Sequence, residues 1–160
     1  MESIQFVIEL ENGKSMKGEL YPEIAPITVE NFVKLVQEHF YDGLIFHRVI
    51  LGFMIQGGGV DASMRPKAAT SIKGEFKSNG ISNPLKHTRG VLSMARTMVK
   101  DSASSQFFIM QADAPHLDGD YAAFGKITEG LDVVDEIARV KTNRQDCPLE
   151  PIIIKTMRLL

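Results

Sequence analysis

The sequence has a single cysteine, little net charge and no tryptophan. One cysteine, Cys147, among 160 residues excludes an intrachain disulfide framework and favours a reducing compartment, so we expect the cytoplasm. A net charge of −2 argues against nucleic acid or an anionic membrane as the main partner. No run approaches the ~18 apolar residues of a membrane span, and the acidic second residue of MESIQFVIELENG argues against a signal peptide.

What remains is the composition of a globular domain, with 44% hydrophobic and 24% charged residues. A chain of this length buries roughly 68–70% of its extended surface. The sequence contains no internal repeat and no linker. We therefore expect a single domain over residues 1–160 that works as a monomer.

Most of the chain has the two-residue period of β-strands. Residues 4–10 alternate, Asn12-Gly13 is a strong hairpin signal, and residues 15–21 return. Further short strands are expected within residues 43–57, 90–95, 105–110, 122–127 and 151–159.

Two segments have a helical period instead. We predict helices within 25–40, with Thr28 as the N-cap, and within 129–140. Because the strands do not alternate with helices, the pattern predicts an antiparallel barrel or sandwich of about eight strands, with the two helices covering its ends.

The stretch between residues 60 and 90 lacks any period and is long for a loop, so we expect it to be functional or packed by its own side chains. Basic residues outnumber acidic ones here. The simplest interpretation is a solvated basic face rather than an anion site. The residues concerned are Arg65, Lys67, Lys73, Lys77, Lys86 and Arg89, against Asp61 and Glu75.

Several familiar ligand-binding motifs are incomplete in this sequence. Gly13-Lys14-Ser15 resembles the end of a phosphate-binding loop, but the required first glycine is Ile8. The segment ADAPHLDGD lacks calcium-loop spacing, and Gly57-Gly58-Gly59 is explained equally well by tight turns and close backbone approach. The histidines show no metal-ligand spacing with one another or with the cysteine; they are His39, His47, His87 and His116.

The stretch GLIFHRVILGFMIQGGG, residues 43–59, is strongly apolar yet contains Arg48 and Gln56. If it forms a hairpin about Gly52, residues 48 and 56 are opposite each other, and Met54 shares their face. A guanidinium, an amide and a soft apolar surface could then contact the same ligand, with Phe53 at the turn. The alternative is that a carboxylate elsewhere in the fold binds Arg48, which then only closes a polar gap.

The segment YDGLIFHRVILGFMIQGGG resembles the hallmark of the cyclophilins, the peptidyl-prolyl cis/trans isomerases. The similarity continues, in the family's order, through TRGVLSMART, SASSQFFIM, HLDGDYAAFGKITEGLDVVDEI and IIIKTMRL. The resemblance implies a closed eight-stranded antiparallel barrel capped by two helices. It implies isomerase activity on proline-containing peptides and unfolded proteins, with no cofactor and no metal.

By motif position, the resemblance also implies the site. Arg48 would be the catalytic residue. The binding residues would be Phe53, Met54, Phe108 and Leu117 around the proline, Gln56 and Gln106 on the substrate backbone, Ala95 and Arg96 along the groove, and His47 in support. Phe107 and Phe124 are expected in the core.

Three positions depart from the eukaryotic family pattern. His116 replaces a tryptophan associated with cyclosporin binding, so we expect cyclosporin to bind with reduced affinity. We interpret His116 as a rim residue rather than an acid or base. Tyr121 replaces a histidine and can still line the pocket. Arg96 replaces an asparagine, as in compact bacterial members.

Two alternatives to an isomerase remain. One is a proline-peptide-binding adaptor of the same fold with little turnover. The other is a hydrolase in which Ser102, Ser104 or Ser105 works with His47 or His116, but no strand–turn–helix elbow surrounds these serines.

Overall fold

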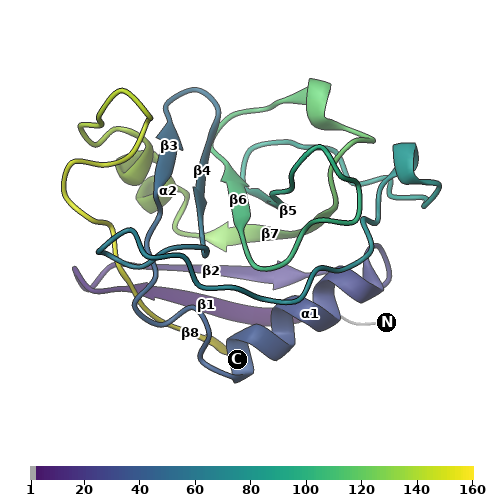
Figure 1. Ribbon diagram of the computed structural model, residues 1–160, viewed down its shortest axis with the longest axis horizontal. Helices are drawn as coiled ribbons and strands as arrows, with labels where there is room; N and C mark the ends of the chain where they lie inside the picture. The colour runs from purple at the N-terminus through teal and green to yellow at the C-terminus, as the bar shows by residue number, and fades with distance from the viewer. Residues whose placement is uncertain (1–2) are drawn as a thin grey trace.

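Eight antiparallel strands form one continuous sheet in the computed structural model, which describes residues 3–160 (Figure 1). Met1 and the acidic Glu2 of the signal-peptide argument lie outside the described residues. The strands pair in the order β3-β4-β6-β5-β7-β2-β1-β8. Their bounds are β1 Ile4–Leu10, β2 Ser15–Leu20, β3 Arg48–Ile50, β4 Met54–Gly57, β5 Val91–Met94, β6 Phe107–Met110, β7 Ala123–Glu129 and β8 Ile154–Leu159.

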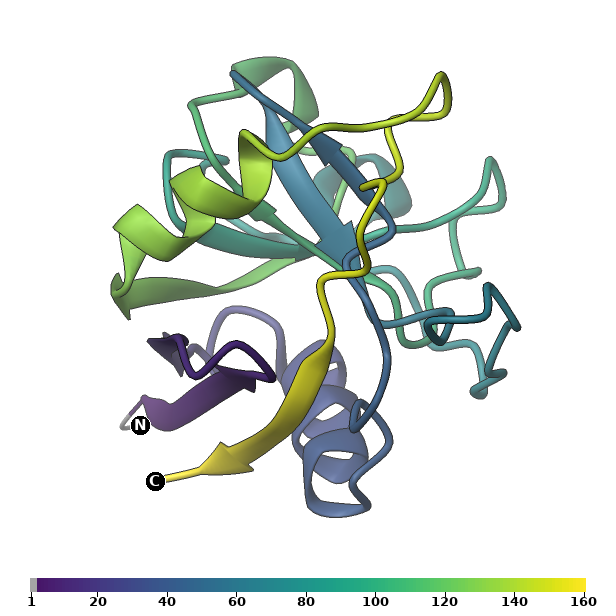
Figure 2. The same ribbon diagram turned by 90° about the vertical axis from the view of Figure 1, so that its left-hand side faces the viewer.

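Two helices lie on opposite sides of these strands, α2 above and α1 below in Figure 2. Helix α1 (Pro26–Gln37) packs against β8, and α2 (Leu131–Ala138) packs against β2, β3 and β4. Two short 3-10 helices, η1 (Lys77–Asn79) and η2 (Pro115–Leu117), lie in the connections. Within residues 3–160, no helix is long and apolar enough to cross a membrane.

The barrel is joined at its seam by the residues that precede β3 rather than by β3 itself. The edge strands β3 and β8 share no ladder in the described part of the chain. Instead Ile45 bridges Ile153, and the amide of Ile154 donates to the carbonyl of Leu44 over 2.8 Å. The predicted eight antiparallel strands and two helices are therefore confirmed, but the barrel is not closed by a β3–β8 ladder in the described chain: the sheet is open there, and contacts such as those of Leu44 and Ile45 join its two edges.

The start of α1 differs from our expectation. Thr28 was predicted as the N-cap, but the N-cap is Ala25, and Pro26 takes the first helical position. Proline is suited to that position because its φ is already helical and its missing N–H would have no intrahelical partner. Thr28 is buried in the first turn, where its amide and hydroxyl donate to Glu75 Oε1 over 2.6 and 2.8 Å. A carboxylate from the 60–90 segment thus does the capping.

The main core is built around the ring of Phe32. Its centroid lies 5.1–5.7 Å from those of Phe6, Tyr41, Phe107 and Phe124, all fully buried. Phe107 and Phe124 are therefore core residues, as predicted. The Tyr41 hydroxyl, the one polar group of this buried side chain, donates to the Ser105 carbonyl over 2.7 Å and is thereby satisfied.

A second, smaller apolar cluster lies under the site described below. It consists of Met54, Val91, Phe108, Met110, Ala114, Leu117 and Ala123. Three members of this cluster, Met54, Phe108 and Leu117, line the cavity of the site.

Candidate active site

The hairpin of β3 and β4 positions the first two site residues. Its register pairs Arg48 with Gln56, Val49 with Ile55 and Ile50 with Met54, as the sequence predicted. The turn is at Gly52, whose φ of +82° favours glycine. The amide of Gly52 donates to Gln111 Oε1 over 2.7 Å, which fixes the turn against the neighbouring segment.

Close backbone approach explains the glycines that follow. A Cβ on Gly57 would lie 2.6 Å from the carbonyl oxygen of Ile45, and Gly58 has a φ of +87°. These constraints hold β4 against the segment that closes the barrel, so the glycine run is structural and does not indicate a nucleotide.

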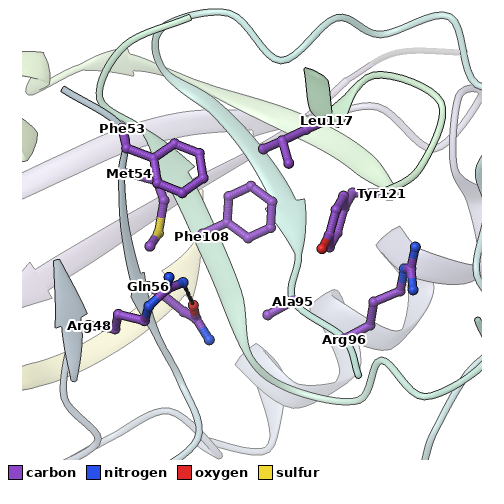
Figure 3. A pocket seen from close by; sticks show the side chains of 9 residues that line it. All are labelled: Arg48, Phe53, Met54, Gln56, Ala95, Arg96, Phe108, Leu117 and Tyr121. Atoms are coloured by element: carbon purple, nitrogen blue, oxygen red, sulfur yellow. Dashed lines mark hydrogen bonds between the residues drawn. The ribbon is translucent and has the colours of Figure 1, made fainter. Parts of the chain in front are cut away.

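A cavity of about 230 Å³ opens beside this hairpin (Figure 3). One part of its wall is apolar, and the guanidinium and amide of the hairpin lie at another side. The lining residues are Arg48, Phe53, Met54, Gln56, Ala95, Arg96, Phe108, Leu117 and Tyr121. All nine were predicted from the sequence, and they come from four separate segments of the chain.

The apolar wall is mostly buried. Met54, Phe108 and Leu117 expose 1%, 5% and 8% of their surface. The rings of Tyr121 and Phe108 pack nearly perpendicular to each other, with centroids 5.8 Å apart. A small ring of the size of proline can therefore be held by a preformed apolar surface without reorganising the core.

The polar side is a chain of hydrogen bonds. Arg48 Nη1 donates to Gln56 Oε1 over 3.3 Å, and Gln56 Nε2 donates to Gln106 Oε1 over 2.9 Å. The amide of Gln56 is therefore oriented by a donor and an acceptor at once. Its oxygen points to the guanidinium, and its nitrogen points away.

Although the run around Arg48 is strongly apolar, Arg48 itself is exposed. The reason is alternation, because the buried Val49 faces the core and its neighbour faces the cavity. Within residues 3–160, no carboxylate oxygen lies within 4.0 Å of the Arg48 nitrogens. The alternative in which a carboxylate binds Arg48 is therefore not observed in this part of the chain.

Arg96 is held by other groups. Its guanidinium lies 4.7 Å from the ring centroids of both Phe76 and Tyr121, and it donates to the carbonyls of Asp120 and Thr97. This places the charge between two rings and fixes Tyr121 against the cavity. Arg96 therefore connects the cavity wall to the 60–90 segment.

Three predicted residues lie next to the cavity rather than in its wall. Gln106 lines an adjacent polar recess of about 280 Å³ with Gln56, Ala95, Arg96, Thr97, Ser102 and Ser104. His116 is exposed, with its ring 5.8 Å from that of Phe53, at the rim. His47 is half-buried; burial and the charge of Arg48 lower its pKa, and its Nδ1 has no hydrogen-bond partner among the described residues.

Comparison with known proteins agrees with this geometry. The model of the family described as cyclophilin type peptidyl-prolyl cis-trans isomerase/CLD matches residues 5–159. The chain belongs to the cyclophilin family.

The relatives of this cyclophilin include bacterial enzymes. A peptidyl-prolyl cis-trans isomerase of Acinetobacter baylyi is 49% identical over 158 residues, covering 92% of this chain and 81% of the relative. Peptidyl-prolyl cis-trans isomerase B of Escherichia coli is 44% identical, covering 86% and 88%. The crystal structure of a Cryptosporidium parvum cyclophilin has a TM-score of 0.84 and 29% identity, covering 99% and 98% of the two chains.

One group of residues beside this cyclophilin pocket could not be predicted from the sequence. His87 is buried beneath Phe108 and hydrogen-bonded to Ser93 and Asp118. Ser93 is six residues and Asp118 thirty-one residues from His87, and together they match no motif spacing, so only the fold brings them together. Phe76 was missed for the same reason.

Proposed function

We propose that this cyclophilin catalyses cis/trans isomerisation of X–Pro bonds and that Arg48 is the residue that stabilises the twisted amide. The observation that carries this proposal is an exposed guanidinium without a carboxylate partner in the described chain, at one side of an apolar cavity. The related crystal structure of a Cryptosporidium parvum cyclophilin in the presence of the dipeptide Ala-Pro supports a proline-containing ligand.

The chemistry requires little beyond such a site. Resonance in the X–Pro amide sets a rotation barrier of about 18–20 kcal/mol. During rotation the prolyl nitrogen becomes pyramidal and regains its lone pair. A donor aimed at this nitrogen therefore binds the twisted state and not the planar ground state, which is the condition for catalysis. Arginine suits this task because it remains charged and only donates.

Arg48 cannot supply the whole acceleration. Turnover in milliseconds needs a rate increase of about 10⁴- to 10⁵-fold, equivalent to roughly 5.5–7 kcal/mol. One charge-assisted hydrogen bond contributes on the order of 1.5–3 kcal/mol. The remainder must come from the apolar wall, which fixes the proline ring and excludes water from the rotating amide, and from Gln56, which holds the substrate backbone.

We further propose that the physiological partners are proline-containing peptides and unfolded proteins, bound by a cytoplasmic monomer. The single thiol, Cys147, supports a reducing compartment. Cyclosporin should bind with reduced affinity, because the exposed His116 stands where the family's tryptophan would supply a larger apolar surface.

The alternative of an adaptor with little turnover predicts binding without catalysis. The deciding experiment follows exchange of an Ala–Pro peptide by NMR with and without the protein. Catalysed exchange that depends on Arg48 supports the enzyme. Peptide binding without accelerated exchange supports the adaptor.

A further inference from the structure

A buried serine, a buried histidine and a partly exposed aspartate lie behind the apolar wall. His87 Nδ1 lies 2.9 Å from Asp118 Oδ1, and His87 Nε2 lies 2.8 Å from Ser93 Oγ. The His87 and Ser93 side chains are 1% and 0% exposed, so a substrate cannot reach them. The arrangement therefore does not serve as a hydrolytic site, although it resembles one in outline.

None of the serines considered from the sequence takes part. The Ser102 hydroxyl bonds within its own loop, to the Thr97 and Val99 backbone and the Thr97 hydroxyl. The Ser105 hydroxyl donates to the carbonyl of Gly58 over 2.8 Å. The only histidine hydrogen-bonded to a serine in the described residues is thus a buried one that our sequence analysis did not connect with serine.

The hydrogen bonds define which nitrogen of His87 carries the proton. Burial alone would raise the pKa of Asp118, but its hydrogen bonds from the His87 amide, over 2.6 Å, and from the His87 ring hold the pKa below its usual range. Asp118 is therefore a carboxylate that accepts, and Nδ1 of His87 donates to it. Nε2 is then an acceptor, and the Ser93 hydroxyl donates to it.

This network is attached to two walls of the proline pocket. The imidazole of His87 stacks on the Phe108 ring, with centroids 6.1 Å apart and planes at 21°. Ser93 pairs with Phe108 in the β5–β6 register. Asp118 directly follows Leu117, and the carbonyl of His87 accepts from the Ala114 amide over 2.8 Å.

We propose that neutral His87, held between Ser93 and Asp118, is a positioning residue that fixes Phe108 and Leu117 for proline binding. The proposal rests on the isomerase function proposed above. His87 touches no substrate; it acts through the ring stacked on it and through the segment that carries Leu117.

Protonation is the natural perturbation of this network. An imidazolium carries a proton on Nε2, so that nitrogen and the Ser93 hydroxyl would both present donors, and one must turn away inside the protein. Burial, partly offset by Asp118, lowers the pKa of His87, and the charge of His116 lowers it further. The charge of Lys86 also lowers the pKa of Asp118. His87 is therefore neutral at neutral pH and becomes charged only on acidification.

The test follows two quantities against pH: kcat/KM for an Ala–Pro peptide, and the NMR signals of His87, Phe108 and Leu117. In the wild type, kcat/KM and the three NMR signals should all change with the same midpoint pH on acidification. Ser93→Ala removes the donor that favours neutral imidazole, so this midpoint should rise by about half a pH unit. Asp118→Asn removes the charge that favours imidazolium, so the acid midpoint should fall by a similar amount.

A merely structural role would lower stability in both variants without moving the activity midpoint in opposite directions. His39→Asn is the matched control, because His39 is exposed and asparagine tolerates its φ of +57°. This variant should leave the midpoint unchanged. An activity midpoint that stays fixed while the His87 signal moves overturns the proposal.

A second measurement covers the case in which the protein unfolds before His87 titrates. At neutral pH, folded Ser93→Ala should raise KM at least about threefold with a smaller change in kcat. An unchanged KM overturns the proposal. Failure of isomerisation by the wild type would instead refute the proposed function, while the Phe108 and Leu117 signals would still show whether His87 positions them.

Discussion

Replacement of Arg48 by alanine is the most direct perturbation of the proposed mechanism. The change removes one charge-assisted donor, worth on the order of 1.5–3 kcal/mol, so kcat/KM should fall about 10- to 150-fold. The fold should tolerate it. Arg48 is exposed, and its side chain makes a long hydrogen bond of 3.3 Å to Gln56. The free energy of unfolding should therefore change by no more than about 0.5 kcal/mol.

The assay is NMR exchange spectroscopy on an Ala–Pro peptide, with urea unfolding of the same samples. Arg48→Lys should retain part of the activity, because it keeps the charge but loses the planar fork. Arg65→Ala is the matched control. Arg65 is also exposed, bonds to Asp61 of its own loop and lines neither the cavity nor the adjacent recess, so its loss should leave kcat/KM unchanged.

The result that would refute the reasoning is a folded Arg48→Ala protein with wild-type kcat/KM. The apolar wall and the glutamines would then account for the whole acceleration. A loss of activity accompanied by loss of folding would be equally damaging, since it would make Arg48 a structural residue.

Three further changes test the surroundings of the site. Gln56→Ala removes a neutral hydrogen-bond partner of the substrate, so kcat/KM should fall only about 2- to 12-fold, and a larger loss than for Arg48→Ala would reverse the assigned roles. Gly59→Ala would bring a Cβ to 2.4 Å from the Gln106 side chain; activity should fall about threefold or more, and the addition of Gln106→Ala should make the double variant no worse than Gln106→Ala alone. Hydrogen bonds from Arg89 and Gln111 lower the pKa of Asp135 to about 2, so this carboxylate contributes stability that is lost as pH falls from about 4 towards 2. Urea unfolding of Asp135→Asn should show lower stability at neutral pH and a weaker loss over that acid range; equal acid sensitivity would show that Asp135 is not responsible.

The β3–β4 hairpin shows why part of this site could be predicted from the sequence. A two-residue period, a glycine turn and the requirement that one face be buried leave one register, so Arg48 and Gln56 had to be opposite each other. The cavity wall required the family resemblance, because Phe108, Leu117 and Tyr121 come from segments whose mutual placement no local pattern determines.

The errors have a shared physical cause. Thr28 was predicted as the N-cap from neighbouring residues, whereas the acceptor for its amide is Glu75, which is distant in sequence. Arg96 lines the cavity as predicted, but its contact with Phe76 was missed because that contact depends on the same tertiary placement. Buried polar groups take whichever partner the fold brings close, and this choice leaves no periodic signal.

The exposure of Arg48 clarifies how the site can catalyse at little cost to the fold. In the free protein the guanidinium is hydrated, so it carries no desolvation penalty and needs no carboxylate. In the proposed mechanism, a bound X–Pro segment would cover it and exclude water, and the hydrogen bond to the prolyl nitrogen would then form at lower effective dielectric. The strength of this hydrogen bond would therefore be available only in the complex and only when the amide is twisted. A compensating carboxylate would have weakened it in both states, which gives a physical reason why the charge beside this apolar wall has no such partner in the described chain.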